Sequence, residues 1–260
     1  MPFFQNGDTH KARSILLHSL KTATEKNVKV GIPCIYDMLA TLAYKDGDVN
    51  SAEKLLIEVI ERLIADGISE DDNRIINFSM KLSRVYSYLK RDNLAELGFK
   101  NCISLQKRKI MNGIKEEESG MLWLSLLFWY GKFLLSRKRY DEASTYLEGA
   151  LSASAQVKGV LSSQIMVILY NLSETAMAKK DYDGALIYLL NAVILGKGTN
   201  NSDLPMYYVK IGNAYLLKGV CDQAKVWCEE GRKVAKALRC KETEVEAVCC
   251  LKKLKAINSA

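Results

Sequence analysis

The stretch KKDYDGALIYLLNA, residues 179–192, decides the fold because it joins a helical pattern to a row of small side chains. Ala185, Leu189 and Ala192 follow one another at intervals of four and three, which is the spacing of one face of an α-helix. Gly184 stands just before them, although a glycine inside a helix costs about 1 kcal/mol relative to alanine. The pattern indicates that a second helix crosses this face closely enough to require small residues.

The same face recurs along the whole chain, each time led by a small residue. The leading alanines are 40, 43, 48, 42 and 39 residues apart. The six sets are Ala12–Leu16–Ser19, Ala52–Leu56–Val59, Ala95–Phe99–Cys102, Ala143–Leu147–Ala150, Ala185–Leu189–Ala192 and Ala224–Cys228–Gly231. A glycine stands five residues before the alanine in three sets, at Gly7, Gly47 and Gly219. An internal repeat of roughly 40 residues therefore governs the interpretation of the whole chain.

A second apolar helix is expected before each small-residue helix after the first. It carries its own small residue beside its large ones, as at Gly131, Ser173 and Gly212. Two such helices joined by a short turn form an antiparallel hairpin, and small residues on the facing sides let the two axes approach. The sequence therefore predicts an all-α, right-handed superhelical solenoid of about twelve helices. The five alanines from Ala52 to Ala224 are expected at the helix crossings, with almost no exposed surface.

The order of an aromatic residue or leucine, then Leu-Gly, then tyrosine, then alanine, an apolar residue and alanine resembles the tetratricopeptide repeat. The resemblance implies a single repeat domain over residues 1–260. Residues 8–26 are expected as a second helix without its first, and 241–257 as a C-terminal capping helix. The five full repeats are expected at about 33–66, 76–112, 121–157, 166–197 and 205–239. Because the spacing exceeds the usual 34 residues of this repeat, longer helices or loops are expected, above all around 108–120.

The composition argues against several other classes of protein. The chain has 260 residues, 48% of them apolar, and its most apolar stretch, 121–135, is interrupted by Lys132. That stretch is shorter than the ~20 residues that span a bilayer, so a buried helix is expected there. The first ten residues resemble neither a signal peptide nor an Arg-rich transit peptide. The seven cysteines show no C-x-x-C pair and no zinc spacing, so we expect them reduced and mostly core-filling, as in an intracellular protein.

No catalytic constellation is found in the sequence, so no enzyme is expected. There is no glycine-rich phosphate loop, no zinc-protease motif and no nucleophile elbow. His10 and His18 are eight residues apart on one expected helix, a spacing that does not suit a metal pair. The acidic pairs and runs, such as Glu229–Glu230, are typical of a solvated face. We therefore expect no cofactor, no metal and no small-molecule substrate.

The remaining activity is protein binding, in the groove that the first helices of stacked hairpins line. Counting away from the expected core residues assigns one side of each first helix to this groove. The assigned residues are Asn77, Met80, Arg84, Tyr88, Phe128, Lys132, Leu135, Tyr170, Glu174, Met177, Val209 and Asn213. Some members of the repeat family clamp a C-terminal carboxylate with lysine, asparagine and arginine. Asn213 is present here, but Val209 stands one turn earlier where a lysine would be expected, which argues against such a clamp.

The C-terminal part of the chain is basic. Residues 210–260 hold eleven Lys or Arg against six Asp or Glu, within a net charge of +7 for the chain. Tyr215 and Trp227 belong to expected core positions, so no nucleic-acid interface with stacking aromatics is expected. A solvated basic surface, or contact with an acidic partner or an anionic inner leaflet, is left open. The apolar side of the capping helix is expected to consist of Val245, Val248, Leu251 and Leu254.

Three strings fall on loop and variable positions of the repeat and so carry a narrower resemblance. They are YDMLATLA (36–43), EDDNRIINFSMKLSRVY (70–86) and GFKNCIS (98–104). They resemble the mitochondrial members of the repeat family that assist the assembly and maintenance of respiratory complex III. The resemblance implies a non-enzymatic protein on the matrix side of the inner mitochondrial membrane. Such a protein binds complex III and helps to clear fragments of its Rieske subunit.

Members of that family carry an N-terminal extension with the import signal and the first helix of the opening hairpin. Residues 1–7 hold neither, so either a truncated chain or a short N-terminal cap is expected there. The alternative function is a cytosolic peptide or cargo adaptor of the kinesin-light-chain type, whose repeats are also longer than usual. An upstream coiled coil would favour the adaptor, and an upstream Arg-rich presequence would favour the mitochondrial protein.

Overall fold

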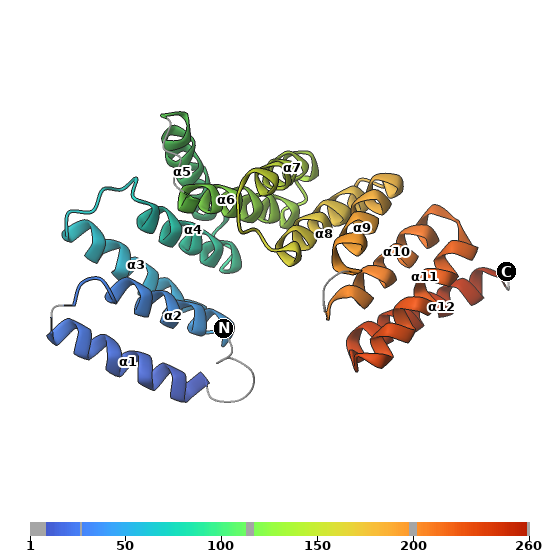
Figure 1. Cartoon of the computed structure of the whole chain (residues 1–260), viewed down its shortest axis with the longest axis horizontal. Helices are drawn as coiled ribbons and strands as arrows, with labels where there is room; N and C mark the ends of the chain where they lie inside the picture. The colour runs from blue at the N-terminus through green and yellow to red at the C-terminus, as the bar shows by residue number, and fades with distance from the viewer. Residues whose placement is uncertain (1–8, 27, 113–116, 198–201, 259–260) are drawn as a thin grey trace. The chain divides into compact units, whose positions relative to one another are not determined.

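The computed structural model describes residues 9–26, 28–112, 117–197 and 202–258. Over these residues the chain forms twelve α-helices and no β-strand (Figure 1), which confirms the all-α fold. The contacts group the chain into two compact units, residues 1–126 and 127–260, where the sequence analysis expects one repeat domain. The boundary falls inside α6 (Glu117–Ser136).

The first unit holds five complete helices and the beginning of a sixth. They are α1 (Thr9–Glu25), α2 (Ile32–Lys45), α3 (Val49–Ala65), α4 (Asn73–Tyr88), α5 (Asp92–Met111) and the first part of α6 (Glu117–Ser136). Helices α2 and α3 pack as one hairpin and α4 and α5 as a second, while α3 packs against α4 and α1 against α2. The core between α2, α3 and α4 is built from the apolar side of each helix, with Tyr36, Leu56 and Phe78 among its large members.

The second unit continues the same arrangement from the second part of α6. It holds α7 (Tyr140–Gln156), α8 (Ser162–Ala178), α9 (Tyr182–Lys197), α10 (Leu204–Lys218), α11 (Cys221–Ala237) and α12 (Lys241–Asn258). Helices α8 and α9 form one hairpin and α10 and α11 another, α7 packs against α8, and α9 against α10. Helix α12 packs on α11 and α10 (Figure 1), so it covers the last hairpin as the expected cap.

The residue five positions before each leading alanine has the same backbone conformation in all five hairpins. Gly47 and Gly219 have φ angles of +80° and +84°, and Lys90, Lys138 and Lys180 occupy the equivalent position at 61–62°. This left-handed conformation ends the first helix of the hairpin and turns the chain into the second. It explains why a glycine recurs at this position, since only glycine adopts it without strain. Gly7, the third glycine of the sequence pattern, lies outside the described residues.

We expect the substitution Gly219→Ala to lower the free energy of unfolding by about 1 kcal/mol, because alanine is strained at this φ angle. A Cβ atom at Gly219 would meet no atom within 4 Å, so the loss of stability would come from the backbone conformation and not from a steric clash. Gly149 supplies the matched control: it lies inside α7, where its added Cβ would touch only Leu127 at an ordinary 3.4 Å. Gly149→Ala is expected to stabilise the chain. Urea unfolding of both variants checks the opposite signs, and two shifts of the same sign would contradict this assignment.

The leading alanines lie at the helix crossings, as the sequence predicts. Ala52, Ala95, Ala143, Ala185 and Ala224 are each 0% exposed. The small residues of the facing helices are equally necessary. A Cβ atom at Gly131 would lie 2.8 Å from Cγ of Leu147, and one at Gly212 only 2.3 Å from Sγ of Cys228. The recurrent small residues of the 40-residue pattern therefore correspond to one close helix crossing in each hairpin.

Glycine is required at position 184 for a different reason from the one that requires alanine at position 185. The carboxylate of Asp181 accepts a hydrogen bond from the backbone N–H of Gly184 at 2.9 Å and so caps the start of α9. A Cβ atom at Gly184 would lie 2.2 Å from Oδ2 of the same carboxylate. The glycine therefore makes room for the cap, while Ala185 makes room for the neighbouring helix.

Within the described part of the chain, each terminal helix packs against its neighbours through one side. No residue of α1 is fully buried, although its repeat positions Ala12, Leu16 and Ser19 are partly covered. At the other end α12 buries Ala247, Cys250 and Leu254. The expectation that Val245 belongs to the buried side is wrong, since it is 62% exposed. The buried side of α12 starts two residues later than the sequence count placed it, while Val248 and Leu251 are partly buried.

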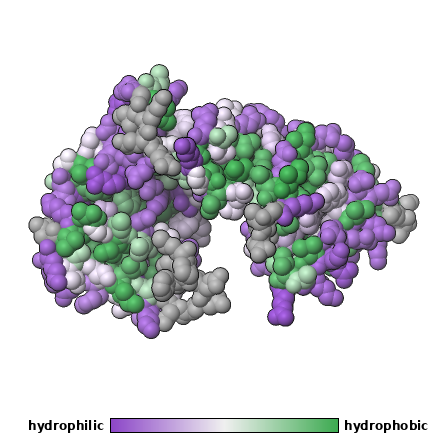
Figure 2. Space-filling view, in the orientation of Figure 1, coloured by the Kyte–Doolittle hydropathy of each residue, from purple (hydrophilic) through white to green (hydrophobic). Residues whose placement is uncertain are grey.

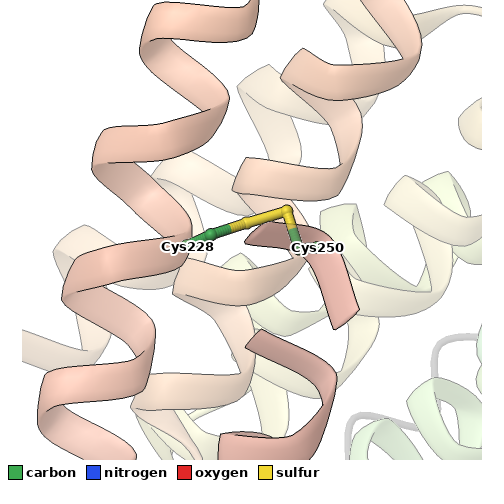
Figure 3. Close-up of a disulfide and its surroundings, with 2 residues drawn as sticks. All are labelled: Cys228 and Cys250. Carbon is green, nitrogen blue, oxygen red and sulfur yellow. A yellow bond between two sulfur atoms is a disulfide. The ribbon is translucent and has the colours of Figure 1, made fainter. Parts of the chain in front are cut away.

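The prediction that all seven cysteines are reduced is also wrong in the structure. Cys228 of α11 and Cys250 of α12 form a disulfide with an S–S distance of 2.06 Å (Figure 3). The packing of the cap on α11 brings the two residues together, and a separation of 22 residues gives no sign of it in the sequence. Of the free cysteines, Cys102 is buried and core-filling, whereas Cys34 and Cys249 are exposed.

The long repeat spacing around residues 108–120 is taken up at least partly by longer helices. Helices α5 and α6 have 20 residues each, compared with 14–17 in the helices of the other hairpins. Residues 113–116 of this segment lie outside the described residues.

Candidate partner-binding groove

The first helices of the hairpins carry the residues that the sequence analysis assigns to a groove. Ten of the twelve keep exposed surface: Tyr88 and Lys132 are exposed, and Asn77, Arg84, Phe128, Leu135, Tyr170, Glu174, Met177 and Asn213 are partly buried. The other two do not. Met80 is 4% exposed and Val209 0%, and Val209 lies against Gly231 of α11, so neither side chain offers a surface to a partner.

A small pocket lies between α2 and α4 in the first unit. Its volume is about 220 Å³, and its walls include Thr41, Tyr44 and Lys45 of α2 and Lys81 and Arg84 of α4. Leu56 and Val85, each 2% exposed, supply apolar lining. We call it the cationic pocket, because three of its lining residues carry positive charge.

The Arg84 side chain is held against an aromatic ring in this pocket. Its guanidinium carbon lies 5.7 Å from the centre of the Tyr44 ring, and the Tyr44 ring meets Tyr88 edge to face at 5.9 Å. Burial lowers the pKa of Arg84 from its ordinary value, although the nearby Tyr44 acts in the opposite direction. A buried guanidinium of this kind gains more from an anionic ligand than an exposed one does, because water screens it less.

A second pocket lies at the other end of the same two helices. It has a volume of about 440 Å³ and is lined by apolar residues, among them Val30 and Pro33 before and within α2, Leu63 of α3 and Phe78 of α4. The predicted groove residue Asn77 also lines it. The charges around it are paired within the protein, since Lys29 contacts Asp66 at 2.6 Å. We call it the apolar pocket.

An ion pair stands between the two pockets. Lys81 of the cationic pocket contacts Asp37 of α2, which lines the apolar pocket. The Lys81 ammonium also lies 5.9 Å from the centre of the Phe78 ring. The pair therefore links α2 to α4 and separates a mainly cationic part of the groove from a mainly apolar part.

An equivalent cluster links α8 to α10 in the second unit. Lys210 lies 3.9 Å from the carboxylate of Glu174 and 5.7 Å from the centre of the Tyr170 ring. Tyr170 in turn meets Tyr207 edge to face at 6.1 Å. Burial lowers the pKa of Lys210, but the attraction of Glu174 and Tyr170 outweighs it, so the pKa is raised and the side chain stays charged. The structure thus brings two of the predicted groove residues, Tyr170 and Glu174, to one cation.

Phe128 and Lys132 lie on α6, around Trp129. The Phe128 and Trp129 rings are 5.2 Å apart, and the Lys132 ammonium lies 5.1 Å from the Trp129 ring. Lys132 is exposed and Phe128 half-buried. This part of α6 therefore presents aromatic surface with a cation beside it, the composition that favours protein contacts.

Counting within each helix misses the residue two positions before the small residue on two of the first helices, α4 and α10. Lys81 stands two before Ser83, and Lys210 two before Gly212. Each of these lysines reaches an acidic residue of the preceding first helix, Asp37 and Glu174 respectively. A position-by-position comparison of these two repeats reveals the shared lysine, whereas counting within one helix does not.

The described surface of each unit mixes polar and apolar residues. Figure 2 shows hydrophobic patches set among hydrophilic residues over both units. The described residues contain no group of three or more His, Cys, Asp or Glu able to hold a metal ion. Among the helices that the structure describes, none has the length and apolar character needed to cross a membrane.

Comparison with known proteins identifies the repeat and the relatives of the chain. The tetratricopeptide repeat family model matches residues 124–157. The chain is 28% identical to mitochondrial tetratricopeptide repeat protein 19 of Mus musculus, over 89% of this chain and 66% of that protein. It is also 28% identical to the Homo sapiens protein, over 88% and 63% of the two chains. The Drosophila melanogaster homologue is 26% identical over 94% and 67%. The chain thus spans somewhat less than two thirds of the mammalian relatives.

Solved structures show the same fold at low sequence identity. BtubC (BKLC) from P. vanneervenii superposes with a TM-score of 0.75 at 18% identity, over 90% of this chain and 93% of that one. Apo RapI gives a TM-score of 0.69 at 16% identity, over 83% and 74%. Kinesin-light-chain-like repeats from Podosopora anserina give 0.56 at 17% identity, over 78% and 94%. The fold is a solenoid of tetratricopeptide-type hairpins, and the chain is similar to mitochondrial tetratricopeptide repeat protein 19.

Proposed function

We propose that this protein is a non-enzymatic scaffold that binds respiratory complex III and supports its assembly or maintenance. The finer role is the clearance of Rieske subunit fragments, on the matrix side of the inner mitochondrial membrane. The coarser part, a tetratricopeptide-type scaffold with mitochondrial relatives, rests on the matches to animal proteins over 88–94% of the chain. The complex III role rests on the narrower resemblance of residues 36–43, 70–86 and 98–104.

The observation that carries the binding role is the surface of the first helices. Partly exposed aromatic side chains lie beside single charges at Tyr44 and Arg84, at Trp129 and Lys132, and at Tyr170 and Lys210. Aromatic residues and arginine are enriched in the centres of protein interfaces. The exposed lysines of α12, Lys252, Lys253 and Lys255, favour peripheral contact with an anionic membrane surface as a secondary part of the proposal.

Affinity capture tests the proposed function. The full chain is immobilised and exposed in parallel to detergent-solubilised mitochondria and to cytosol, and retained proteins are identified by mass spectrometry. We expect enrichment of complex III subunits from the mitochondrial extract. Retention of a kinesin or another cytosolic transport protein, with no complex III subunit retained, would overturn the proposal in favour of the adaptor.

Substitutions that remove an aromatic ring from the groove are expected to weaken this capture. Phe128→Ala and Tyr170→Ala should each cost more than about 1 kcal/mol of binding free energy, because desolvated aromatic anchors dominate interfaces. Lys233→Ala is the control, since Lys233 is an exposed residue of α11 whose charge lies 3.6 Å from Glu230. It should leave capture nearly unchanged. Circular dichroism of each variant separates lost binding from lost folding, and equal capture by folded variants and wild type would contradict the groove assignment.

A further inference from the structure

The capping helix α12 is joined to the last hairpin by a small apolar cluster. The four buried members of the cluster are Ala224, Cys228, Cys250 and Leu254. Two of these four are the cysteines that form the disulfide between α11 and α12 (Figure 3). Among the described residues of α12, Ala247 is the one other buried residue. The bonded cysteines therefore make up a large part of the buried contact between the cap and the hairpin.

Cys228 stands at a position that a larger apolar residue fills in the other repeats. The equivalent residues are Leu16, Leu56, Phe99, Leu147 and Leu189. The sulfur of Cys228 faces Gly212 of α10, where an added Cβ atom would lie only 2.3 Å from it. A thiol side chain is smaller than leucine or phenylalanine, so it buries less apolar surface. The last repeat therefore has less packing at its centre than the others and depends more on its covalent bond.

The other contacts of the cap are limited. Val245 and Cys249 are exposed, so α12 packs through one side. Exposed Glu246 attracts Lys210 of α10, but an exposed charge contributes little to stability. A helix with few buried contacts opens at a lower free energy than the whole domain unfolds. Opening of α12 would also give a reductant access to the disulfide, whose cysteines Cys228 and Cys250 are 0% and 1% exposed in the closed form.

We propose that the Cys228–Cys250 disulfide is a redox-controlled clamp on the capping helix. With the bond formed, α12 stays packed on α10 and α11. With the bond reduced, α12 detaches readily and uncovers the apolar side chains packed against the cluster, among them Tyr215 and Leu216. In compartments that hold thioredoxin-type dithiols, a disulfide is typically transient or redox-sensing, which agrees with a reversible clamp. The clamp goes beyond the proposed scaffold role and does not depend on which protein the groove binds.

Thiol–disulfide exchange with a dithiol opens the clamp. One thiolate of the dithiol attacks one sulfur of the pair, a mixed disulfide forms, and the other cysteine leaves as a thiolate that takes up a proton. The second thiolate of the dithiol then attacks the mixed disulfide and releases the first cysteine, which is protonated in turn. Two electrons and two protons thus pass to Cys228 and Cys250, and the dithiol becomes a disulfide. Oxidised glutathione closes the clamp again and is converted to two molecules of reduced glutathione.

Hydrogen exchange of the full chain in its two redox forms tests the proposal. One sample is oxidised with oxidised glutathione, and peptide mapping without reductant identifies the bond between Cys228 and Cys250. The other sample is kept in dithiothreitol, and a phosphine reductant in the quench gives the same peptides from both. We expect the amides of α12 to exchange at least about tenfold faster in the reduced form, because the bond no longer restricts opening. The amides of α8 and α9 should exchange equally in both forms, which shows that the domain stays folded.

Two cysteine variants assign the effect to the bond. Cys250→Ala cannot form it, so its α12 amides should exchange fast with or without dithiothreitol, as in the reduced wild type. Cys249→Ala is the matched control, because it removes the neighbouring exposed thiol of the same helix. It should respond to dithiothreitol as the wild type does. Adding oxidised glutathione to the reduced wild type should restore both the bond and the slow exchange of α12, a reversal that a merely structural defect would not show.

Three outcomes would overturn the proposal. They are failure of Cys228 and Cys250 to form a bond in oxidised glutathione, equal exchange of α12 in the two redox forms, and faster exchange of α8 and α9 together with α12 on reduction. The last outcome would mean that the bond stabilises the whole unit and does not control the cap. Capture of complex III tests the proposed function separately, so either result can fail without the other.

Discussion

Phe99→Ala is expected to lower the free energy of unfolding by about 3–5 kcal/mol, the cost of removing a buried phenylalanine ring. Phe99 lies in the middle of α5 and is 0% exposed, between Ala95 and Cys102 of the same repeat face. The hairpin of α4 and α5 cannot collapse onto the lost volume easily, because its close contacts are already made through small residues. A Cβ atom added at Gly98, for example, would lie 2.2 Å from Oγ of Ser83.

Leu97 supplies the control for this prediction, because it stands on the same helix and is 67% exposed. Leu97→Ala should change stability by less than about 1 kcal/mol, as most surface substitutions do. Urea unfolding followed by circular dichroism measures both variants. A similar midpoint shift for Phe99→Ala and Leu97→Ala would contradict the position of α5 in the hairpin.

Ala185→Leu is expected to lower the free energy of unfolding by about 1–3 kcal/mol, as overpacking of a core does. Ala185 is 0% exposed at the crossing of α9 with α8, beside Leu186 and Leu189 of the core of the second unit. Three additional heavy atoms at this crossing force the two helices apart. The loss therefore comes from the neighbours that must move, although leucine itself is more apolar than alanine.

Lys179→Leu adds a leucine in the adjoining turn and serves as the control. Lys179 makes an ion pair with Asp141 at 2.6 Å, but its side chain is 41% exposed and that of Asp141 89% exposed. Exposed pairs of this kind contribute little, so only a small shift of the unfolding midpoint is expected. Equal shifts for Ala185→Leu and Lys179→Leu would show that the crossing is not close-packed.

The repeat could be predicted from sequence because each close helix crossing requires small residues at fixed positions in the two helices. A crossing tolerates only small residues, so Ala143 and Gly131 mark one hairpin in the same way that Ala224 and Gly212 mark another. The turn between the two helices is likewise marked in the sequence by Gly47 and Gly219, which adopt its left-handed conformation. Where the equivalent position is filled by Lys90, Lys138 or Lys180, the left-handed backbone is present without a sequence signal.

The groove was harder to predict because its register depends on how each first helix turns about its axis. An error of one position exchanges a buried side chain for an exposed one, and for this reason the sequence pattern assigns Val209 to the groove in place of its neighbour Lys210. The cationic pocket depends on two helices from different repeats. The pattern of its own helix predicts Arg84, but Tyr44 and Lys45 join it only through the packing of α2 against its neighbours.

The disulfide could not be inferred for a related reason. Cys228 occupies the middle position of its repeat face, which leucine or phenylalanine fills in the other sets; there it faces Gly212 and would serve equally well as a reduced core residue. Only the placement of the capping helix brings Cys250 to it (Figure 3). The repeat pattern thus predicts the contacts between successive helices. A disulfide between the capping helix and its neighbour can be identified only in the folded structure.

Direct binding to purified complex III tests the central claim, that this chain is a groove-based scaffold for a mitochondrial partner. The full chain is immobilised, complex III in detergent is titrated over it, and the equilibrium response is recorded for wild type, Tyr170→Ala and Lys233→Ala. The account predicts saturable binding by wild type and by Lys233→Ala, with at least about fivefold weaker binding by Tyr170→Ala, which corresponds to about 1 kcal/mol. Absence of saturable binding by the folded wild-type chain would contradict it.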